Sequence, residues 1–499
     1  MSTSRRKLEK QLERASNYAE WRAAALTLDR KTGAERWKLM DRSRRYDYTS
    51  IRIRLDRLRE LRARQDNIGL LFNLNEGIHG NMGGMGSSRL YGRALYGTKK
   101  LVSDYVKEIN DALLYLARPE VDDVSLAEKI DFFHRASQCY GSSALMLSGS
   151  GSLLYFHVGV VKALWENGLL PKVLSGSSGG AMIAAIAGTH RPDELQHMFE
   201  PSFLLEEVKR ESSLWDRLSS LRPQPLAPER LREVLERLVP DLTFQEAYNL
   251  TGLQINVSVA PAETHQSSRL LNAIASPNVF IRDALMATTA VPGVYPPVML
   301  TAKNVHGERQ PYLRTRRWVD GAVSDDLPAR RLGRLYGVNH FIVSQTNPLV
   351  LPFVRDDDGR PRNFLSGYGY AAGVAARAFI NAGLDSMSGM LARVPTLERM
   401  ANVSRSVINQ RYTGDINIMP SYRLVDPRKL LALRSEEEVM ELIRAGERAA
   451  WPKLEMIRLQ SMIGRTLDGI LVDIEQGLID DAGVEPQMPA AARLQVANG

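Results

Sequence analysis

The sequence predicts an α/β protein whose mainly parallel sheet is covered by helices on both faces. From Ser143 onward, apolar runs of four to eight residues alternate with segments of helical period, a pattern typical of strands joined by crossover helices. Apolar residues make up 44% of the 499 and charged residues 24%, so the chain is globular rather than disordered. The lone Cys139 excludes a disulfide framework and a cysteine-based zinc site.

The elements of this core follow one another in a regular order. Strands are predicted in the short apolar runs SALML, KVLSGSS, LQINVSVA (253–260) and HFIVSQ (340–345). Helices are predicted between them, in YFHVGVVKALWENG and GAMIAAIAG.

Helical regions are predicted on both sides of the core. We expect a helical N-terminal domain over 1–140, the α/β core over 141–345, a helical region over 346–480 and a disordered tail over 481–499. Within the first of these, helices are expected at about 99–116 and 125–138, whereas the glycine-rich segment 75–98 predicts a long irregular loop.

Positive charge is concentrated in the N-terminal domain. Residues 1–64 hold 19 Lys or Arg against 9 Asp or Glu, a net of +10, so the rest of the chain contributes −2 to the total of +8. Such a block indicates an anionic partner, either nucleic acid or an anionic membrane surface, or else a solvated face of amphipathic helices. No nucleic-acid-binding module is recognisable, and we expect no nucleic-acid partner.

No segment has the features of a secretory signal or of a membrane span. The N-terminus MSTSRRKLEKQLER lacks an apolar core, and the uncharged stretches 136–161 and 284–302 are broken by glycines or prolines. We therefore expect a cytoplasmic protein that has no transmembrane helix and that can lie peripherally on a membrane.

The most specific local feature is Gly176-Ser177-Ser178-Gly179-Gly180, which follows an apolar run and opens a helix of small residues. Strand, sharp turn and helix are the context of a G-x-S-x-G nucleophile elbow. The turn holds the serine in strained backbone geometry, so its neighbours two positions away must be glycine. The pattern predicts Ser178 as a nucleophile at a helix N-terminus, where developing negative charge is favoured.

A nucleophilic serine needs a base, and no histidine offers a clear one. None of the candidates lies at a position that demands the role, and we interpret them as structural or surface residues: His190, His197, His265, His306 and His340.

A carboxylate is the alternative base, and Asp320 is the best candidate. In Trp318-Val319-Asp320-Gly321-Ala322, an apolar pair is followed by an acid and then by two small residues, Gly321 and Ala322. Small residues let the serine and its substrate approach the carboxylate closely. Asp325 and Asp326, in a polar run before a proline, are interpreted as a solvated turn or helix cap.

Acyl transfer also needs donors for the oxyanion. Gly149, Ser150, Gly151 and Ser152 lie between a predicted strand and a predicted helix, where successive backbone N–H groups form an anion-binding concavity. The N–H of Gly179 adds a further donor. A dinucleotide-binding loop is the alternative interpretation, but Leu154 occupies the position of its last glycine.

Taken together, these residues resemble the patatin-like phospholipases and acylglycerol lipases, which use a Ser/Asp dyad and no histidine. RDALMATTAVPGVYPPV (282–298) is similar to the family's segment before the dyad aspartate. Other segments resemble the subgroup of fungal and plant storage-lipid triacylglycerol lipases and their bacterial relatives: YAEWRAAALTLD, IGLLFNLNEGIHGNMGG, SRLYGRALYGTKKLVSDYV and RYTGDINIMPSYR (411–423). The resemblance covers roughly residues 18–465 and implies a three-layer patatin-like core; Ser150 departs from the family's usual run of glycines.

The resemblance implies a serine acyl hydrolase of lipid esters, acting on triacylglycerol or phospholipid. Ser178 would attack the acyl carbonyl and Asp320 would take its proton, with no metal or organic cofactor. The basic residues 1–64 would hold the enzyme on anionic lipid. Two alternatives remain open: an acyltransferase using the same dyad, and a catalytically weakened, membrane-bound lipid-binding or scaffold protein. The sequence does not indicate an oligomeric state.

Overall fold

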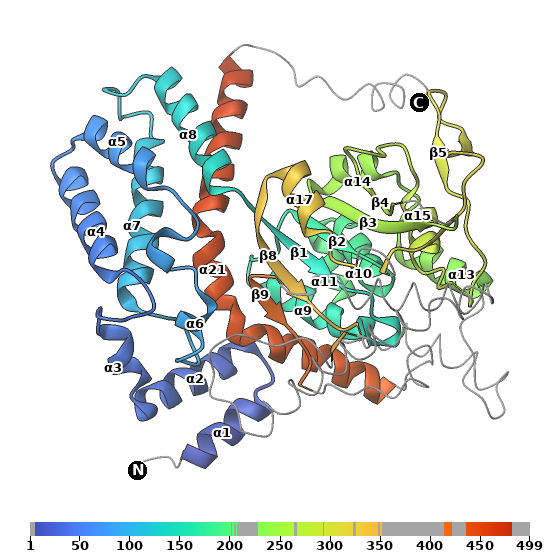
Figure 1. The fold of residues 1–499 in the computed structure, drawn as a ribbon, viewed down its shortest axis with the longest axis horizontal. Helices are drawn as coiled ribbons and strands as arrows, with labels where there is room; N and C mark the ends of the chain where they lie inside the picture. Colours follow the sequence, from blue (N-terminus) through green and yellow to red (C-terminus); the bar gives the residue numbers. More distant parts are fainter. Residues whose placement is uncertain are drawn as a thin grey trace, which may run out of the picture. The chain divides into compact units, whose positions relative to one another are not determined.

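The computed structural model describes residues 5–200, 202–203, 206, 228–263, 267–292, 294–322, 326–347, 350–351, 414–421 and 436–481 (Figure 1). The chain divides into two compact units. The first unit consists of Met1–Thr32, Tyr91–Gly97 and Ser143–Ile457, and the second of Gly33–Leu90, Thr98–Ser142 and Arg458–Gly499. The long stretch expected to be helical after residue 362 and the expected tail lie largely outside the described residues.

The first unit is built on a mainly parallel sheet with strand order β4-β3-β2-β1-β8-β9, and β7 also pairs with β3. The strands are β1 (Ser142–Leu147), β2 (Val173–Gly176), β3 (Gln254–Pro261), β4 (Arg269–Leu271), β7 (Trp318–Asp320), β8 (Val338–Ser344) and β9 (Ile416–Ile418). The pairs β1–β2, β2–β3 and β8–β9 are parallel, whereas β4 and β7 run antiparallel to β3. The predicted α/β class is confirmed. One correction is needed, because β9 is a strand inside the region expected to be helical.

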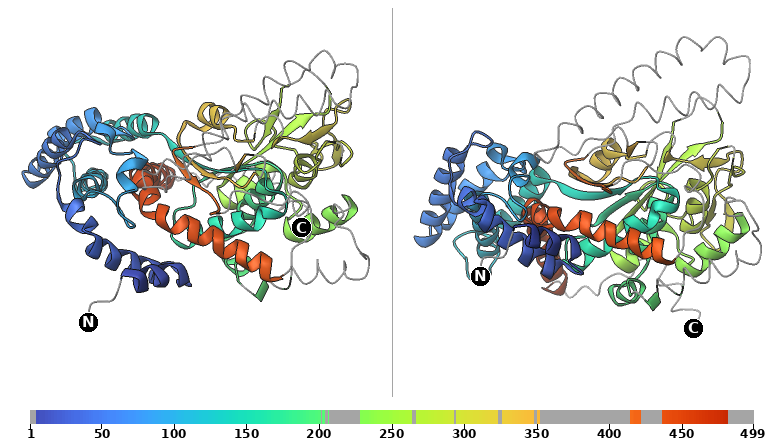
Figure 2. Two further views of the ribbon diagram at one scale, coloured as in Figure 1. Left: turned by 60° about the horizontal axis from the view of Figure 1, so that its bottom comes forward. Right: turned by 90° about the horizontal axis from the view of Figure 1, so that it is seen from below.

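Helices cover both faces of this sheet. Alternate residues of β1 divide between the two faces: Leu145 and Leu147 pack in one hydrophobic cluster, and Ala144 and Met146 in another. The first face carries α9 (Leu154–Glu166), α10 (Gly179–Thr189) and the N-terminal part of α21 (Glu436–Asp481), and the second carries α17 (Ala329–Tyr336). Figure 2 shows α17 in gold and α21 in red on opposite sides of the strands.

The position of β7 follows from the pairing register of β3. Val257 of β3 pairs with Gly176 of β2 and with Leu271 of β4, so β2 and β4 lie on opposite edges of β3. Further along, Val259 pairs with Arg269 of β4 and with Asp320 of β7. Strand β7 therefore lies on the same edge of β3 as β2, directly beyond the residue where β2 ends.

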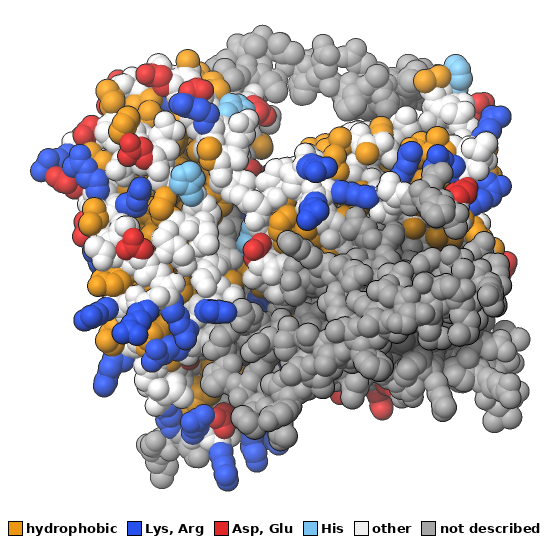
Figure 3. Space-filling model, viewed as in Figure 1, with side chains coloured by type: hydrophobic (Ala, Val, Ile, Leu, Met, Phe, Trp, Pro, Cys, Tyr) orange, Lys and Arg blue, Asp and Glu red, His pale blue; other side chains and the backbone are white. Residues whose placement is uncertain are grey.

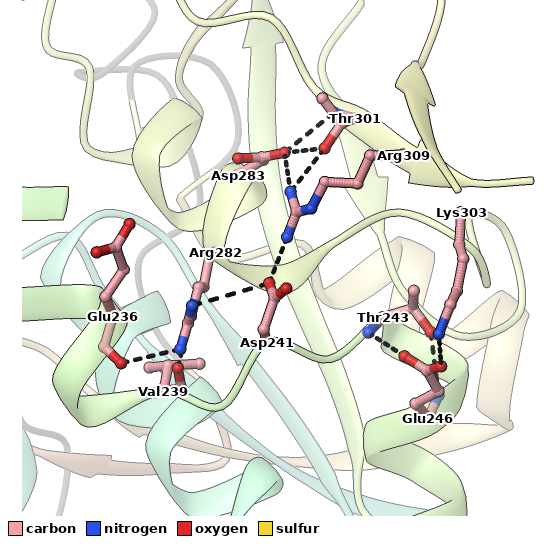
Figure 4. Close-up of polar contacts among 10 residues, drawn as sticks. All are labelled: Glu236, Val239, Asp241, Thr243, Glu246, Arg282, Asp283, Thr301, Lys303 and Arg309. Carbon is pink, nitrogen blue, oxygen red and sulfur yellow. Dashed lines mark hydrogen bonds and ion pairs between the residues drawn. The ribbon is translucent and has the colours of Figure 1, made fainter. Parts of the chain in front are cut away.

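A network of ion pairs holds the segment that leads into β7 (Figure 4). This segment contains the hairpin of β5 (Thr301–Lys303) and β6 (Arg309–Pro311). Arg309 forms ion pairs with Asp241 and with Asp283, which lies on α15 (Ile281–Thr288). The Asp283 carboxylate also accepts hydrogen bonds from the N–H and the hydroxyl of Thr301. Lys303 pairs with Glu246 of α14 (Phe244–Thr251) at 2.6 Å. The same contacts tie the hairpin to the helices packed against β3.

The remaining helices of the first unit are α1 (Arg5–Arg14), α2 (Tyr18–Thr32), α11 (Pro192–Met198) and α13 (Pro228–Leu238). The second unit is helical, with α3 (Ala34–Leu39), α4 (Tyr48–Ala63), α5 (Asn67–Gly77), α7 (Lys100–Leu116), α8 (Leu126–Tyr140) and the C-terminal part of α21. The segment 75–98, expected to be wholly irregular, also contains a short 3-10 turn (Met82–Gly84) and the one-turn helix α6 (Ser88–Tyr91).

In the second unit, the buried Lys99, which precedes α7, binds the C-terminus of α3. Its ammonium group donates hydrogen bonds to the carbonyls of Trp37 and Met40 and lies 4.3 Å from the centre of the Trp37 ring.

Among the helices that the structure describes, none combines the length and the hydropathy needed to cross a membrane.

Candidate active site

Ser178 occupies the turn between β2 and α10. Its backbone has φ 50° and ψ −127°, a conformation that side-chain-bearing residues rarely adopt. The space on either side admits only glycine, because a Cβ at Gly176 would lie 2.5 Å from the nitrogen of Ala181 and a Cβ at Gly180 would collide with the carbonyl of Leu147. The local sequence thus permits the strained turn that presents the Ser178 side chain at the end of the sheet.

Two hydrogen bonds hold this turn from the side of α15. The N–H of Ser178 donates to the hydroxyl of Thr288 at 3.0 Å, and that hydroxyl donates to the carbonyl of Ser258 at 2.7 Å. Thr288 thereby connects the strained residue to β3. Sequence reasoning did not single out Thr288, since a threonine at a helix end carries no distinctive pattern.

Asp320 lies beside Ser178 because β7 continues the line of β2. The N–H of Ala322 donates a hydrogen bond to the Asp320 carboxylate at 2.8 Å, and the Ser178 hydroxyl lies close enough to lower the pKa of this group. Asp320 is 5% exposed. Burial raises the pKa of Asp320 to about 7, and the nearby Asp326 adds to the rise, whereas the Ala322 N–H and the Ser178 hydroxyl offset part of it. The result is a carboxyl group that can exchange a proton near neutral pH.

The loop Gly149–Ser152 faces this pair of residues. A Cβ at Gly149 would lie 3.0 Å from the Cβ of Ala322 and 3.8 Å from the Cβ of Ser178. Contrary to expectation, the N–H of Gly149 is already engaged, since it donates to Asp326 at 2.7 Å. Within the described residues, the N–H groups of Ser150, Gly151 and Gly179 have no hydrogen-bond partner, so these three are available to bind an anion.

Asp326 is buried at this site, which corrects its interpretation as a residue of a solvated turn. Its carboxylate accepts hydrogen bonds from the N–H of Gly149, the Ser177 hydroxyl and, at 3.0 Å, the Asn347 side chain. It therefore joins the loop Gly149–Ser152 to the turn that carries Ser178. The apolar Leu327-Pro328 that follows was the available signal that this acid enters the core. Asp325 lies outside the described residues.

His157 on α9 holds the base of the same loop. It is fully buried, and burial lowers its pKa to about 4, so the ring is neutral. Its Nε2 lies 3.0 Å from the carbonyl of Ser148, and its Nδ1 lies 2.7 Å from the Ser344 hydroxyl. The N–H of Thr346 donates to the Ser148 hydroxyl at 2.8 Å. His157 was not among the histidines considered from the sequence, although its place in the apolar run YFHVGVV indicated burial.

Comparison with known proteins gives matches over nearly the whole chain. Residues 1–138 match a domain of unknown function, DUF3336, and residues 145–332 match the patatin-like phospholipases. A patatin-like phospholipase domain-containing protein of Yarrowia lipolytica is 35% identical over 474 residues, 91% of this chain and 56% of that protein. Triacylglycerol lipase 4 of Saccharomyces cerevisiae is 33% identical over 90% of this chain and 51% of its own length. Triacylglycerol lipase ptl2 of Schizosaccharomyces pombe is 32% identical over 93% of this chain and 75% of its own length.

The chain belongs to the patatin-like phospholipase family. This confirms the resemblance that the elbow, the glycine-serine loop and the Asp-Gly-Ala segment indicated. The chain spans about half the length of several curated patatin-like relatives that it matches. The crystal structure of VipD from Legionella pneumophila aligns with 61% of this chain and 67% of its own at a TM-score of 0.27 and 15% identity, too remote for an argument.

No metal-binding group is apparent in the part of the patatin-like chain that the structure describes, because it contains no cluster of three or more His, Cys, Asp or Glu side chains suited to a metal ion. The described residues of the site are a serine hydroxyl, a buried carboxyl group of raised pKa, and a loop of backbone donors.

Proposed function

We propose that this patatin-like protein hydrolyses fatty-acyl esters of lipids with Ser178 as nucleophile and Asp320 as base. The observation that carries the proposal is the position of Ser178, held in a strained turn, close enough to the buried Asp320 carboxyl group to lower its pKa. Two of the relatives are named triacylglycerol lipases, which supports an acylglycerol or phospholipid ester as the substrate.

The reaction has two halves. In the first, Asp320 takes the proton of Ser178 while the serine oxygen bonds to the acyl carbon, and the N–H groups of Ser150, Gly151 and Gly179 bind the oxyanion. The carbon–oxygen bond to the glycerol breaks, and the alcohol leaves with the proton from Asp320. In the second half, Asp320 deprotonates a water that attacks the acyl-enzyme, and the fatty acid is released as the proton returns to Ser178.

Substitution of either dyad residue tests the chemistry. Ser178→Ala and Asp320→Asn should each lower kcat for a soluble ester such as dihexanoylglycerol by roughly a thousandfold or more, with fatty-acid release as the readout. Asp131→Asn, an exposed carboxyl group on α8, is the matched control and should retain full activity. Turnover that survives in Ser178→Ala would refute the proposal. Acyl transfer to an added lysolipid in place of fatty-acid release would instead identify a transferase.

We also propose that residues 1–64 bring the enzyme to an anionic lipid surface as a peripheral cytoplasmic protein. In the second unit, the segment 36–45 carries Leu39 and Met40 at 61% and 56% exposure. Arg36, Arg42 and Arg44 flank this apolar pair in the sequence, are exposed, and have no acidic partner within the described residues. Figure 3 shows blue and orange side chains intermixed over the region of α3, a composition suited to the interface of an anionic membrane.

A further inference from the structure

The loop Gly149–Ser152 carries a side chain that the proposed mechanism does not use. Ser150 is 1% exposed, and its hydroxyl has no hydrogen-bond partner within the described residues. A buried hydroxyl group without a partner is unfavourable, because it has lost its hydrogen bonds to water. The buried side chains of Asp326 and His157, in the same site, both have hydrogen-bond partners. The unpaired hydroxyl therefore marks a place for an atom of a ligand.

The backbone of the loop accepts a side chain at position 150 more readily than at its two neighbours. Ser150 has a φ of −135°, whereas Gly151 has a φ of 52°, in the left-handed region that favours glycine. On the other side, a Cβ at Gly149 would lie only 3.0 Å from the Cβ of Ala322. Of these three residues, Ser150 is therefore the one that can bring a side chain to the site without strain.

The Ser150 hydroxyl lies at the N-terminal end of α10. A Cβ at Gly179, the first residue of that helix, would collide with this hydroxyl. Cα–Cβ bonds in a helix tilt toward its N-terminus, which is also the direction in which its first N–H groups point. The hydroxyl therefore lies on the side to which these N–H groups are directed, beside the residue that follows the nucleophile. The G-x-S-x-G pattern allows any residue at position 179, and the glycine found there leaves room for the hydroxyl.

We propose that the Ser150 hydroxyl is a side-chain donor to the oxyanion, in addition to the backbone N–H groups. The inference rests on the proposed hydrolase function and deepens it. When the Ser178 oxygen bonds to the acyl carbon, the Ser178 proton passes to Asp320 and the π electrons of the carbonyl group move to its oxygen. A hydroxyl donates a stronger hydrogen bond to this charged oxygen than to the neutral ester, so it lowers the barrier rather than only tightening substrate binding. A loop of glycines alone lacks such a donor.

Removal of the hydroxyl group alone tests this role. Ser150→Ala keeps the backbone N–H and should lower kcat for dihexanoylglycerol by about 10- to 100-fold, while KM changes by less than about twofold. Ser175→Ala is the matched control and should keep the kcat of the wild type, because Ser175 on β2 is also buried and its hydroxyl also lacks a partner within the described residues. The melting temperature of Ser150→Ala should equal or exceed that of the wild type, since the variant loses an unpaired buried hydroxyl.

Two soluble inhibitors distinguish a donor to the oxyanion from a residue that only shapes the site. A hexyl trifluoromethyl ketone accepts the Ser178 oxygen at its carbonyl carbon while the Ser178 proton passes to Asp320, which leaves an oxyanion like that of the reaction. Dihexyl glycerol ether has no carbonyl group and forms no oxyanion. In Ser150→Ala, the inhibition constant of the ketone should rise by about the factor by which kcat/KM falls, whereas that of the ether should stay unchanged.

The role of Ser150 and the hydrolase function can fail separately. If the wild type is active and Ser150→Ala keeps its kcat, the side-chain donor is overturned and the hydrolase stays intact. Equal weakening of the ketone and the ether, or a lower melting temperature of Ser150→Ala, would show that the hydroxyl supports the structure of the site, and this also overturns the donor. A wild type that releases no fatty acid from dihexanoylglycerol overturns the proposed function itself.

Discussion

At the scale of single residues, the protonation of Asp320 governs the site. Its carboxyl group is buried, and burial with the neighbouring Asp326 raises its pKa to about 7. A base accepts protons best when its pKa lies near the working pH, so this environment suits the proposed role. Asp326 thus has two effects: it accepts a hydrogen bond from the N–H of Gly149, and it adds to the rise in the pKa of Asp320 that burial causes.

The activity should therefore depend on pH through Asp320. The base must be ionised to act, and the ionised form predominates above its pKa, so kcat/KM should rise with pH through about 7 and level off above it. Asp326→Asn removes a negative charge, which should lower the pKa of Asp320 and move this rise to lower pH. A pH–rate profile of both proteins checks the shift. If kcat/KM of Asp326→Asn rose over the same pH range as that of the wild type, the two carboxyl groups would not be coupled.

At the scale of elements, short strands and one helix residue shape the site. Strands β1, β2, β3 and β8 were predictable because each is at least four residues long and contains a run of apolar residues. Strands β4, β7 and β9 have three residues each, too few for a periodic signal, and they were not predicted as strands. Yet the pairing of β7 with β3 is what brings Asp320 to the end of β2. In the same way α9 carries His157 to the base of the oxyanion loop.

His157 should make the fold sensitive to acid. Its pKa is about 4 in the folded protein and 6.5 unperturbed, so the folded state favours the neutral ring. The stabilisation is complete above pH 6.5 and is lost as pH falls from 6.5 toward 4, by roughly 3 kcal/mol in total. Denaturant unfolding measures this loss: the difference in the free energy of unfolding between the wild type and His157→Asn should become smaller as pH falls from 6.5 toward 4. His306→Asn, at an exposed hairpin position, serves as the control, and a gap independent of pH would count against a buried neutral ring.

At the scale of the whole molecule, the charge of +10 in residues 1–64 divides between the two compact units, because the first unit ends its N-terminal segment at Thr32. Much of the charge in the second unit is neutralised locally: Arg59 and Arg62 pair with the buried Glu108, and Arg57 and Arg64 pair with Glu60. The arginines of segment 36–45 differ in lying around an exposed apolar pair. Charge counting alone thus overstates how much of the block can contact lipid.

Vesicle binding should depend on segment 36–45 rather than on the net charge. Arg42→Gln/Arg44→Gln should weaken binding to phosphatidylglycerol-containing vesicles by about 30-fold, since each basic residue near such a surface contributes about 1 kcal/mol. Arg57→Gln/Arg64→Gln changes the net charge equally but removes residues already paired with Glu60, and should bind almost as well as the wild type. Equal losses in both double variants, measured by co-sedimentation, would mean that only total charge matters.

The sequence by itself determined the family, the α/β class and the candidate nucleophile. These depend on local patterns: a strained turn needs glycines at set positions, and buried strands need apolar runs. Only the tertiary structure decided how the candidate residues meet. Asp320 reaches Ser178 through strand pairing between segments about 140 residues apart in the sequence. Asp326 holds the loop Gly149–Ser152 across 177 residues, and His157 joins the base of that loop to Ser344, 187 residues further along. Local pattern carries no information about such contacts, because burial and register arise only when distant segments pack together.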